Sequence, residues 1–159
     1  MEHELGKDVL YMTLKQKLKD SMKEAMKAKD KEQLTSIRLV LSTIQKKEID
    51  KNDGKELTDE EVMQIIQTEI KQTQESLMYA RQSDKSEMII NLENRIQMLT
   101  LYLPKQLSED EVKTSIKNII ESNGFSGKQD MGKVMGLAMA ALKGKTEGAL
   151  ISKVVKELL

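Results

Sequence analysis

The stretch NLENRIQMLTLYLPKQL, residues 91–107, decides the fold because it contains the end of a helix, an abrupt stop and the approach to a second helical region. Pro104, the only proline in the chain, lacks a backbone N–H and ends the helix at or before Leu103. Ser108 and Glu111 then have the spacing of a capping box, so a new helix is expected there. Within the first helix, steps of three and four place five apolar residues on one face toward a core: Met88, Leu92, Ile96, Leu99 and Leu103.

Upstream of this stretch, the sequence predicts a bundle of about four helices over residues 13–103, packed antiparallel because the connections are short. Helix starts are marked by pairs with capping spacing, namely Thr13 with Gln16, Asp30 with Gln33, and Thr58 with Glu61. Apolar residues at helical spacing follow each start and are expected to face inward: Leu14, Leu18, Met22, Ala25 and Met26; then Leu34, Ile37, Leu41 and Ile44; then Val62, Ile66, Ile70, Thr73, Leu77 and Ala80.

Downstream of Pro104, three shorter helices are expected to form a C-terminal domain over residues 104–159. The first ends at the C-cap Gly124, the second begins after Asp130, and the third starts near Thr146. The predicted fold class is therefore all-α, with an N-terminal bundle, a small three-helix domain and a flexible N-terminal extension over residues 1–12. Residues expected inside the small domain are Val112, Ile116, Ile119, Ile120, Met131, Val134, Met135, Ala138, Leu142, Leu150, Ile151, Val154, Val155 and Leu158.

The composition excludes several kinds of chemistry. Basic and acidic residues both number 26, so a net charge of zero gives no whole-chain support for a nucleic-acid or membrane partner. The chain has no cysteine, and its single histidine, His3, lies near the terminus, so thiolate metal sites and histidine bases are not expected. No apolar run approaches the ~20 residues of a membrane span, and no signal peptide is recognisable. A cytoplasmic protein without metal or cofactor is expected.

The high number of methionines has two explanations, and two glycines inside a predicted helix also need one. The 11 methionines either fill irregular gaps in the core, which is the favoured interpretation, or line a groove for a protein partner. Gly132 and Gly136 fall inside a predicted helix, where each glycine lowers helix stability by ~1 kcal/mol relative to alanine. Close approach of a neighbouring backbone is the expected reason for both.

Two short motifs resemble ligand-binding loops but fit helix ends or linkers better. Residues 144–146, Gly-Lys-Thr, lack the upstream glycine of a phosphate loop, because Met139 stands at that position within a predicted helix. Residues 50–61 have the length of a calcium loop, but Lys55 stands where the sharp turn needs a glycine. No catalytic or metal-binding residue is assigned from either motif.

Other charged residues also have structural explanations. The acidic runs 59–61 and 109–111 lie in predicted first helical turns, where carboxylates complement the helix dipole. Arg38 and Arg95 lie near the apolar stripes of their helices, and each is expected to pair with a carboxylate such as Glu48, Glu87 or Glu93. The alternative for these arginines is a contact to a ligand or an RNA phosphate.

The segment from Ser126 to Leu159 carries a local excess of positive charge, with six lysines and three acidic residues. Such lysines either form a solvated face or contact RNA phosphates. No aromatic residue interleaves with them, so any RNA contact is expected to be to the backbone and to shape rather than by base stacking. The candidate nucleic-acid-binding residues are Lys128, Lys133, Lys143, Lys145 and Lys153.

The segment LENRIQMLTLYLPKQLSEDEV, residues 92–112, resembles the GatB/YqeY family in its acidic residue, apolar stripe, Tyr-Leu-Pro-x-Gln-Leu-Ser motif and following acidic residues. DMGKVMG at 130–136 and KGKTEGALISKVVKEL at 143–158 continue the resemblance, which covers the chain from about Leu14. The chain departs from the family pattern at Thr73, where a basic residue is usual, and at the joint Lys85-Ser86, which is usually more apolar. Similar residues also fall upstream, at Arg38, Glu48, Glu60-Glu61-Val62 and Glu75-Ser76.

The resemblance implies functions that composition and spacing do not. One kind of family member is the C-terminal helical region of GatB, a subunit of the glutamine-dependent amidotransferase that converts misacylated Glu-tRNA or Asp-tRNA, in which the last three helices approach the tRNA elbow. The other kind is a stand-alone protein, which this chain resembles. Family association also implies carbon–nitrogen ligase activity with glutamine as amide donor, although this sequence has no phosphate loop, activated nucleophile or histidine base.

Three hypotheses remain open from the sequence. The first is a non-catalytic module that interacts with tRNA or associates with the tRNA-dependent amidotransferase or another aminoacyl-tRNA-handling protein. The second is a protein–protein interaction module that presents a methionine-rich helical groove. The third, which the residues support least, is a part of a glutamine-dependent amidotransferase activity.

Overall fold

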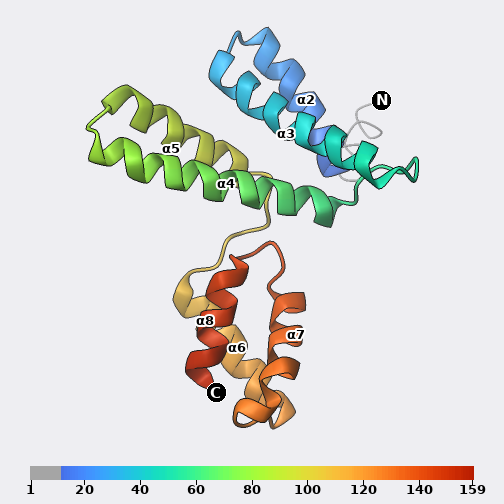
Figure 1. Ribbon diagram of the computed structural model, residues 1–159, viewed down its shortest axis with the longest axis vertical. Coiled ribbons are helices and arrows are strands. Elements are labelled where there is room, and N and C mark those ends of the chain that lie inside the picture. Colours follow the sequence, from blue (N-terminus) through green and yellow to red (C-terminus); the bar gives the residue numbers. More distant parts are fainter. Residues whose placement is uncertain (1–11) are drawn as a thin grey trace, which may run out of the picture. The chain divides into compact units, whose positions relative to one another are not determined.

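The computed structural model describes residues 12–159, which fold into seven α-helices and one short 3-10 helix (Figure 1). No strand occurs in this range, so the predicted all-α fold class is confirmed. The expected N-terminal extension, residues 1–12, lies outside the described residues except for Met12. Between Met12 and Leu159, no helix is both long enough and apolar enough to cross a membrane. The chain divides into two compact units, Met1–Tyr102 and Leu103–Leu159.

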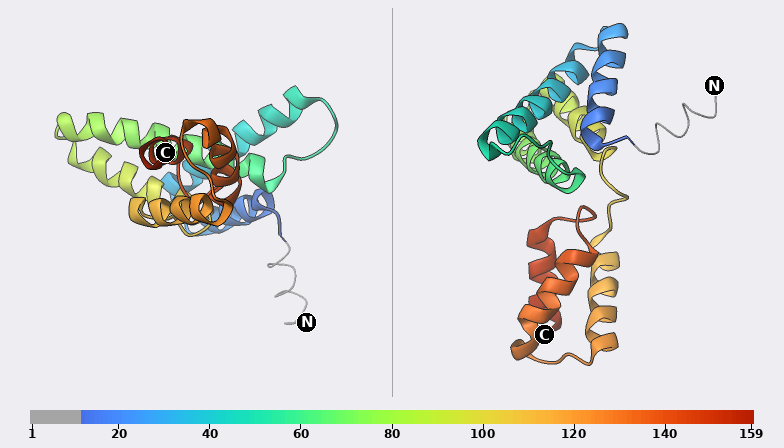
Figure 2. Two further views of the ribbon diagram at one scale, coloured as in Figure 1. Left: turned by 90° about the horizontal axis from the view of Figure 1, so that it is seen from below. Right: turned by 90° about the vertical axis from the view of Figure 1, so that its right-hand side faces the viewer.

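The N-terminal unit is built from two helical hairpins, which Figures 1 and 2 show from three directions. One hairpin joins α2 (Leu14–Lys27) to α3 (Lys31–Lys51), and the other joins α4 (Asp59–Gln82) to α5 (Ser86–Thr100). The first three helices begin at residues whose side chains accept a hydrogen bond from the third helical N–H, as the capping pairs predicted. These N-cap residues are Thr13, Asp30 and Thr58.

Aliphatic side chains form the core of this unit, and α4 follows its predicted stripe completely. All six α4 residues expected to face inward are buried. Met26, also predicted inward, is instead 51% exposed, because it lies in the last turn of α2 beside the hairpin connection. In α5 only Leu99 is buried, and Met88 is 47% exposed. The reason is that α5 packs mainly against α4 and only slightly against α3, so much of its apolar stripe has no neighbour.

One carboxylate joins three segments of the N-terminal unit. Glu48 on α3 accepts hydrogen bonds from Lys15 Nζ at 2.7 and 3.1 Å and from the Leu57 backbone N–H at 2.9 Å. The Lys15 and Glu48 side chains are only 15% and 16% exposed. The hydrogen bond from Lys15 lowers the pKa of Glu48, and the same bond raises the pKa of Lys15. This ion pair ties α2 to α3 and to the segment that precedes α4.

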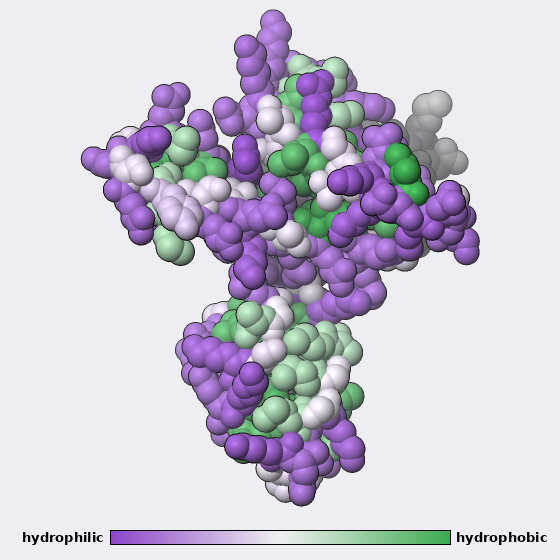
Figure 3. Space-filling model, in the orientation of Figure 1, coloured by the Kyte–Doolittle hydropathy of each residue, from purple (hydrophilic) through white to green (hydrophobic). Residues whose placement is uncertain are grey.

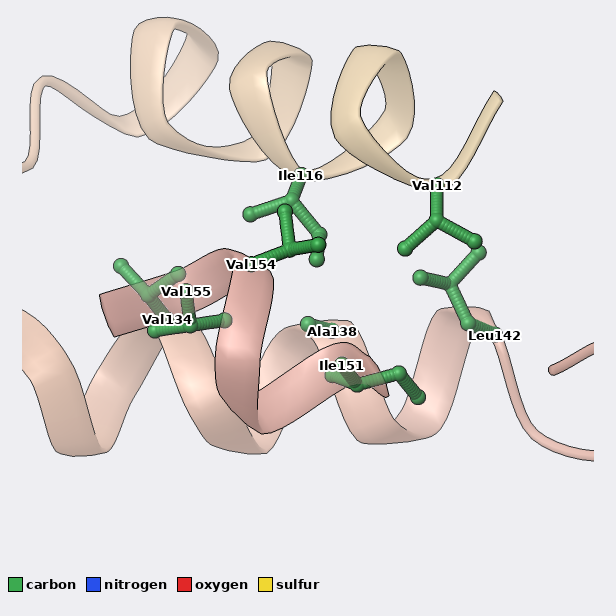
Figure 4. Packing of buried hydrophobic residues seen from close by; sticks show 8 residues of the cluster. All are labelled: Val112, Ile116, Val134, Ala138, Leu142, Ile151, Val154 and Val155. Atoms are coloured by element: carbon green, nitrogen blue, oxygen red, sulfur yellow. The ribbon is translucent and has the colours of Figure 1, made fainter. Parts of the chain in front are cut away.

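The C-terminal unit contains α6 (Glu109–Asn123), the 3-10 helix η1 (Lys128–Asp130), α7 (Met131–Ala141) and α8 (Gly148–Leu158). Gly124 ends α6 at φ +66°, in the left-handed region, as the C-cap prediction required. Leu158, expected inside, is 39% exposed because it occupies the final turn of α8. Figure 4 shows the core that the three α-helices share, made of Val112, Ile116, Val134, Ala138, Leu142, Ile151, Val154 and Val155.

Methionine lies at the edges of both cores rather than inside them. None of the ten methionines between Met12 and Leu159 is fully buried, and the buried apolar residues are leucine, isoleucine, valine and alanine. In the C-terminal unit, Met131, Met135 and Met139 pack partly against the core, and Figure 3 shows weakly hydrophobic surface over α7. The favoured interpretation of methionine as core filling therefore holds for the methionines that pack partly buried against the core, whereas Met26, Met78 and Met88 are exposed.

The two glycines inside α7 do not mark a close backbone approach. A Cβ added at Gly132 or Gly136 would meet nothing within 4 Å, and both residues are exposed. The expectation that a neighbouring backbone requires glycine at these positions is therefore wrong. Both sites could carry a side chain without a clash inside the described structure.

Candidate nucleic-acid interface

Two loops of the C-terminal unit are tied together where α6 begins and where α7 passes to α8. The backbone N–H of Leu107 donates to the carbonyl of Lys145 at 2.9 Å. Gln106 Nε2 donates to the carbonyl of Gly144 at 2.7 Å. These bonds join segments far apart in the sequence, so each loop fixes the position of the other. We call the two segments together the basic loop pair: residues 104–107 and 143–146.

The second loop of the pair turns its two lysines outward. Leu142, Gly144 and Thr146 are buried, whereas the alternate residues Lys143 and Lys145 are exposed. Gly144 has φ +75°, which glycine adopts without the strain that a side chain would introduce. The loop is a tight turn, in which the Lys145 backbone N–H donates to the Leu142 carbonyl at 3.0 Å. Two exposed lysines therefore stand two positions apart on one turn.

Lys105 is a third lysine of the basic loop pair and was not among the lysines predicted from the sequence. It is exposed and precedes Gln106, whose side chain makes the bond to Gly144. Lys105 occupies the variable position of the Tyr-Leu-Pro-x-Gln-Leu-Ser motif, so its place in this motif could have indicated it as a candidate. The start of α8 at Gly148 follows the same loop, and no side chain caps its first N–H groups. The positive end of that helix dipole lies beside the loop, next to the exposed carboxylate of Glu147 at the N-cap position.

The other three candidate lysines lie elsewhere in the unit. Lys128 in η1 and Lys133 in the first turn of α7 are exposed, at the opposite end of α7 from Lys143. At 1.5 Å per residue, the 11 residues of α7 separate these ends by about 16 Å. Lys153 on α8 is exposed, with its Nζ 3.5 Å from a carboxylate oxygen of Glu109. The structure thus brings Lys143 and Lys145 together, places Lys128 and Lys133 at the other end of α7, and pairs Lys153 with Glu109 at the start of α6.

The motifs that resemble ligand loops take part in ordinary local structure. Met139 lies within α7, and Gly144 forms the turn between two helices. Asp50 still belongs to α3, and Asp53 accepts a hydrogen bond from the Lys55 backbone N–H at 3.0 Å. In the part of the chain that the structure describes, no three histidine, aspartate or glutamate side chains come together in a group that could hold a metal ion.

The carboxylates expected to pair with Arg38 and Arg95 have other partners or none. Glu48 pairs with Lys15, and Glu93 accepts a hydrogen bond from Arg81 at 3.1 Å. Within residues 12–159, neither Arg38 nor Arg95 forms an ion pair, so this prediction is wrong. Arg38 is exposed on α3, whereas Arg95 is partly buried and lines a cleft between α3 and α5.

A comparison with protein families identifies the family of this chain. Residues 15–159 match the family model described as Yqey-like protein. The chain belongs to this YqeY-like family. The match includes every residue of the basic loop pair and extends through both units, so the resemblance predicted from residues 92–112 is confirmed. A search of curated proteins found no match to the chain.

Proposed function

We propose that this YqeY-like protein is a cytoplasmic, non-catalytic module that binds tRNA through its C-terminal unit, alone or together with a tRNA-dependent amidotransferase. The observation that carries the proposal is the basic loop pair. Three exposed lysines, Lys105, Lys143 and Lys145, stand on two loops that hydrogen bonds hold together beside the start of α8. Ammonium groups held in this way suit contacts to phosphate oxygens.

The side chains of the basic loop pair favour contacts to the RNA backbone over contacts to its bases. Lysine offers point-charge donors, which neutralise phosphates and release counterions but carry no base sequence information. No aromatic side chain lies in residues 126–159 to stack on a base. The family resemblance supports tRNA as the particular RNA. Lys128 and Lys133, at the other end of α7, would contact separate phosphates of the same molecule.

The non-catalytic part of the proposal is supported by where the pKa shifts fall. In residues 12–159 the affected groups are Lys15 and Glu48 in their ion pair, Glu61 in a capping box, and Tyr102. A hydrogen bond from the Thr58 backbone N–H lowers the pKa of Glu61, and burial raises the pKa of Tyr102. Each shift has a structural cause and none gathers with a second reactive group in one cleft, unlike the usual arrangement in active sites.

The test compares tRNA affinity for two triple variants of the full chain at low ionic strength. Replacing Lys105, Lys143 and Lys145 by alanine is expected to weaken binding at least about tenfold, because three phosphate contacts are lost. The control replaces three exposed lysines of the N-terminal unit, Lys23, Lys46 and Lys71, and makes the same change in net charge. Equal loss in the two variants, or no tRNA binding by the unmodified chain, would overturn the proposal. Turnover of Glu-tRNA by the purified chain alone would overturn its non-catalytic part.

A second candidate is a protein–protein interaction module, and the exposed methionines favour it. Met26, Met78 and Met88 are 51%, 60% and 47% exposed, and methionine adapts to varied apolar partners. Affinity capture from extract, with and without nuclease treatment, separates the two functions. A specific protein that is retained after the RNA has been digested supports this candidate, whereas loss of all partners on digestion contradicts it.

A further inference from the structure

A cleft of about 360 Å³ lies in the N-terminal unit between the beginning of α3 and helix α5, two helices that Figure 1 labels. This volume falls within the range of roughly 300–1,000 Å³ that is usual for small-molecule sites. We call it the α3–α5 cleft. All but one of its lining side chains are polar or charged, and each helix supplies half of them: Asp30, Glu32, Gln33 and Ser36 at the start of α3, and Asn91, Asn94, Arg95 and Met98 on α5.

The two walls of the α3–α5 cleft carry opposite charges. The α3 wall has the carboxylates of Asp30 and Glu32, whereas the α5 wall has the guanidinium group of Arg95. Within residues 12–159, no ion pair joins Arg95 to either carboxylate. The structure therefore holds a positive and a negative wall on either side of one space, without direct contact between the charges.

Most of the polar side chains in the cleft have no partner inside the protein. In the part of the chain that the structure describes, the side chains of Glu32, Asn91, Asn94 and Arg95 form no hydrogen bond and no ion pair. Arg95 is also partly buried, and a charge withdrawn from water is costly unless another group compensates it. Asp30 has one bond, which its carboxylate accepts from the Gln33 backbone N–H at 3.1 Å. The cleft thus offers donors on α5 and acceptors on α3 to a ligand.

The opposite charges of the two walls select the kind of ligand. A phosphate or a dicarboxylate would meet the carboxylates of Asp30 and Glu32, and a polyamine would meet Arg95, so like charges disfavour both. A small molecule with one group of each sign avoids these contacts. We propose that the α3–α5 cleft binds a small zwitterion, a free α-amino acid, with its carboxylate on Arg95 and its ammonium group on Glu32 and Asp30.

The side chains on α5 suit a carboxylate. A guanidinium group offers parallel N–H donors that match the two oxygens of a carboxylate. Asn91 stands one helical turn before Arg95 on the same face of α5, so its amide adds a donor beside the guanidinium group. A wider cleft of about 720 Å³ shares Glu32, Asn91 and Arg95 with the narrower one, so the two form one groove with room for the ligand's side chain. This site lies in the N-terminal unit and does not depend on the proposed RNA binding.

The test is isothermal titration calorimetry of the dialysed full chain with each standard α-amino acid in turn. At least one amino acid is expected to bind with a dissociation constant of about 1 mM or lower. Arg95→Gln is expected to weaken that binding at least about tenfold, because a charge-assisted pair is lost. Glu32→Gln is expected to weaken it at least about threefold, a smaller effect because Asp30 remains on the same wall. The α-amide of the same amino acid lacks the carboxylate, so its weaker binding is expected to be the same with Arg95→Gln as with the unmodified chain.

Arg38→Gln is the matched control, because Arg38 is exposed on α3, does not line the cleft and loses the same charge. This variant is expected to bind the amino acid like the unmodified chain. Glu32 is exposed, so E32Q tests the site even where the change at Arg95 lowers stability. Arg95→Gln is expected to keep its affinity for tRNA, so the failure of one proposal can be told from the failure of the other. No binding of any amino acid at millimolar concentration would overturn the inference, as would equal binding by the Arg95→Gln variant or equal affinity for the α-amide.

Discussion

At the scale of single side chains, the carboxylate of Glu48 joins α2, α3 and the segment before α4. Its pKa is lowered by the hydrogen bond from Lys15, so this stabilisation is present above its unfolded-state pKa and is lost as the pH falls through the folded-state value. The pKa of Lys15 is raised by the same bond, so its contribution is present below the unfolded pKa and is lost as the pH rises through the folded one.

Replacing Glu48 by Gln is therefore expected to lower the free energy of unfolding at neutral pH by on the order of 1 kcal/mol, since a charge-assisted bond is lost from a mostly buried site. Urea unfolding followed by circular dichroism at several pH values measures this. The difference between the two proteins is expected to shrink in acid, where Glu48 becomes protonated. An equal difference at acid and neutral pH would contradict the assignment.

Substitutions at Gly132 and Gly136 are expected to raise the free energy of unfolding, whereas the change at Glu48 lowers it. A Cβ at either position meets no atom within 4 Å, and neither residue has the positive φ that disfavours other residues. Alanine at each position is expected to raise the free energy of unfolding by about 0.5–1 kcal/mol through better helix propensity. Gly124→Ala is the control and is expected to destabilise the protein, because Gly124 has φ +66°. Thermal melts of the three variants provide the comparison, and destabilisation by either α7 substitution would show a hidden contact.

Among helices and loops, α5 separates what periodicity can predict from what it cannot. Spacing placed five apolar residues on one face, but α5 ends at Thr100, so Leu103 lies outside the helix. Spacing could not tell how completely a neighbour covers that face, and only Leu99 is fully buried, whereas Leu92 and Ile96 are partly buried. By contrast, α4 lies against other helices along its whole stripe, so its six predicted positions are all buried. Caps were predictable for a related reason, because they depend on residues three positions apart.

The uneven coverage of α5 can be measured with two truncations. Leu99→Ala removes a fully buried side chain and is expected to lower the free energy of unfolding by about 2–5 kcal/mol. Ile90→Ala removes a side chain that is 57% exposed and is expected to change it by less than about 0.5 kcal/mol at concentrations where the chain is monomeric. Denaturant melts at low protein concentration are the measurement. Similar losses in the two variants would mean that Ile90 is covered in solution.

In the loops of the candidate RNA site, too, sequence spacing could not predict which residues come together. Lys143 and Lys145 were identified from local charge, but Lys105 was not. Its neighbourhood depends on the bond from Gln106 to Gly144, which spans 38 residues of sequence. Arg95 was assigned a partner on the basis of its helix alone, whereas Glu48 and Glu93 were already engaged by lysine and arginine from elsewhere. Long-range pairing of this kind is not encoded in spacing.

For the chain as a whole, the family match and the two cores describe a YqeY-like protein with two helical units. The N-terminal unit has a mostly polar groove between α3 and α5, and the C-terminal unit has lysines on two loops that hydrogen bonds join. Its net charge of zero means that attraction to RNA cannot come from the total charge and must come from such local clusters. The proposed RNA binding is therefore expected to depend on a few lysines.

The most direct test is the salt dependence of tRNA binding by the full chain, measured by fluorescence anisotropy across a range of salt concentrations. If the lysines of the basic loop pair contact phosphates, the logarithm of the association constant falls linearly with the logarithm of the salt concentration. Each substitution of Lys105, Lys143 or Lys145 by alanine is expected to reduce the magnitude of that slope by about 1. A slope unchanged by all three substitutions, or tRNA binding that is insensitive to salt, would contradict phosphate recognition at these loops.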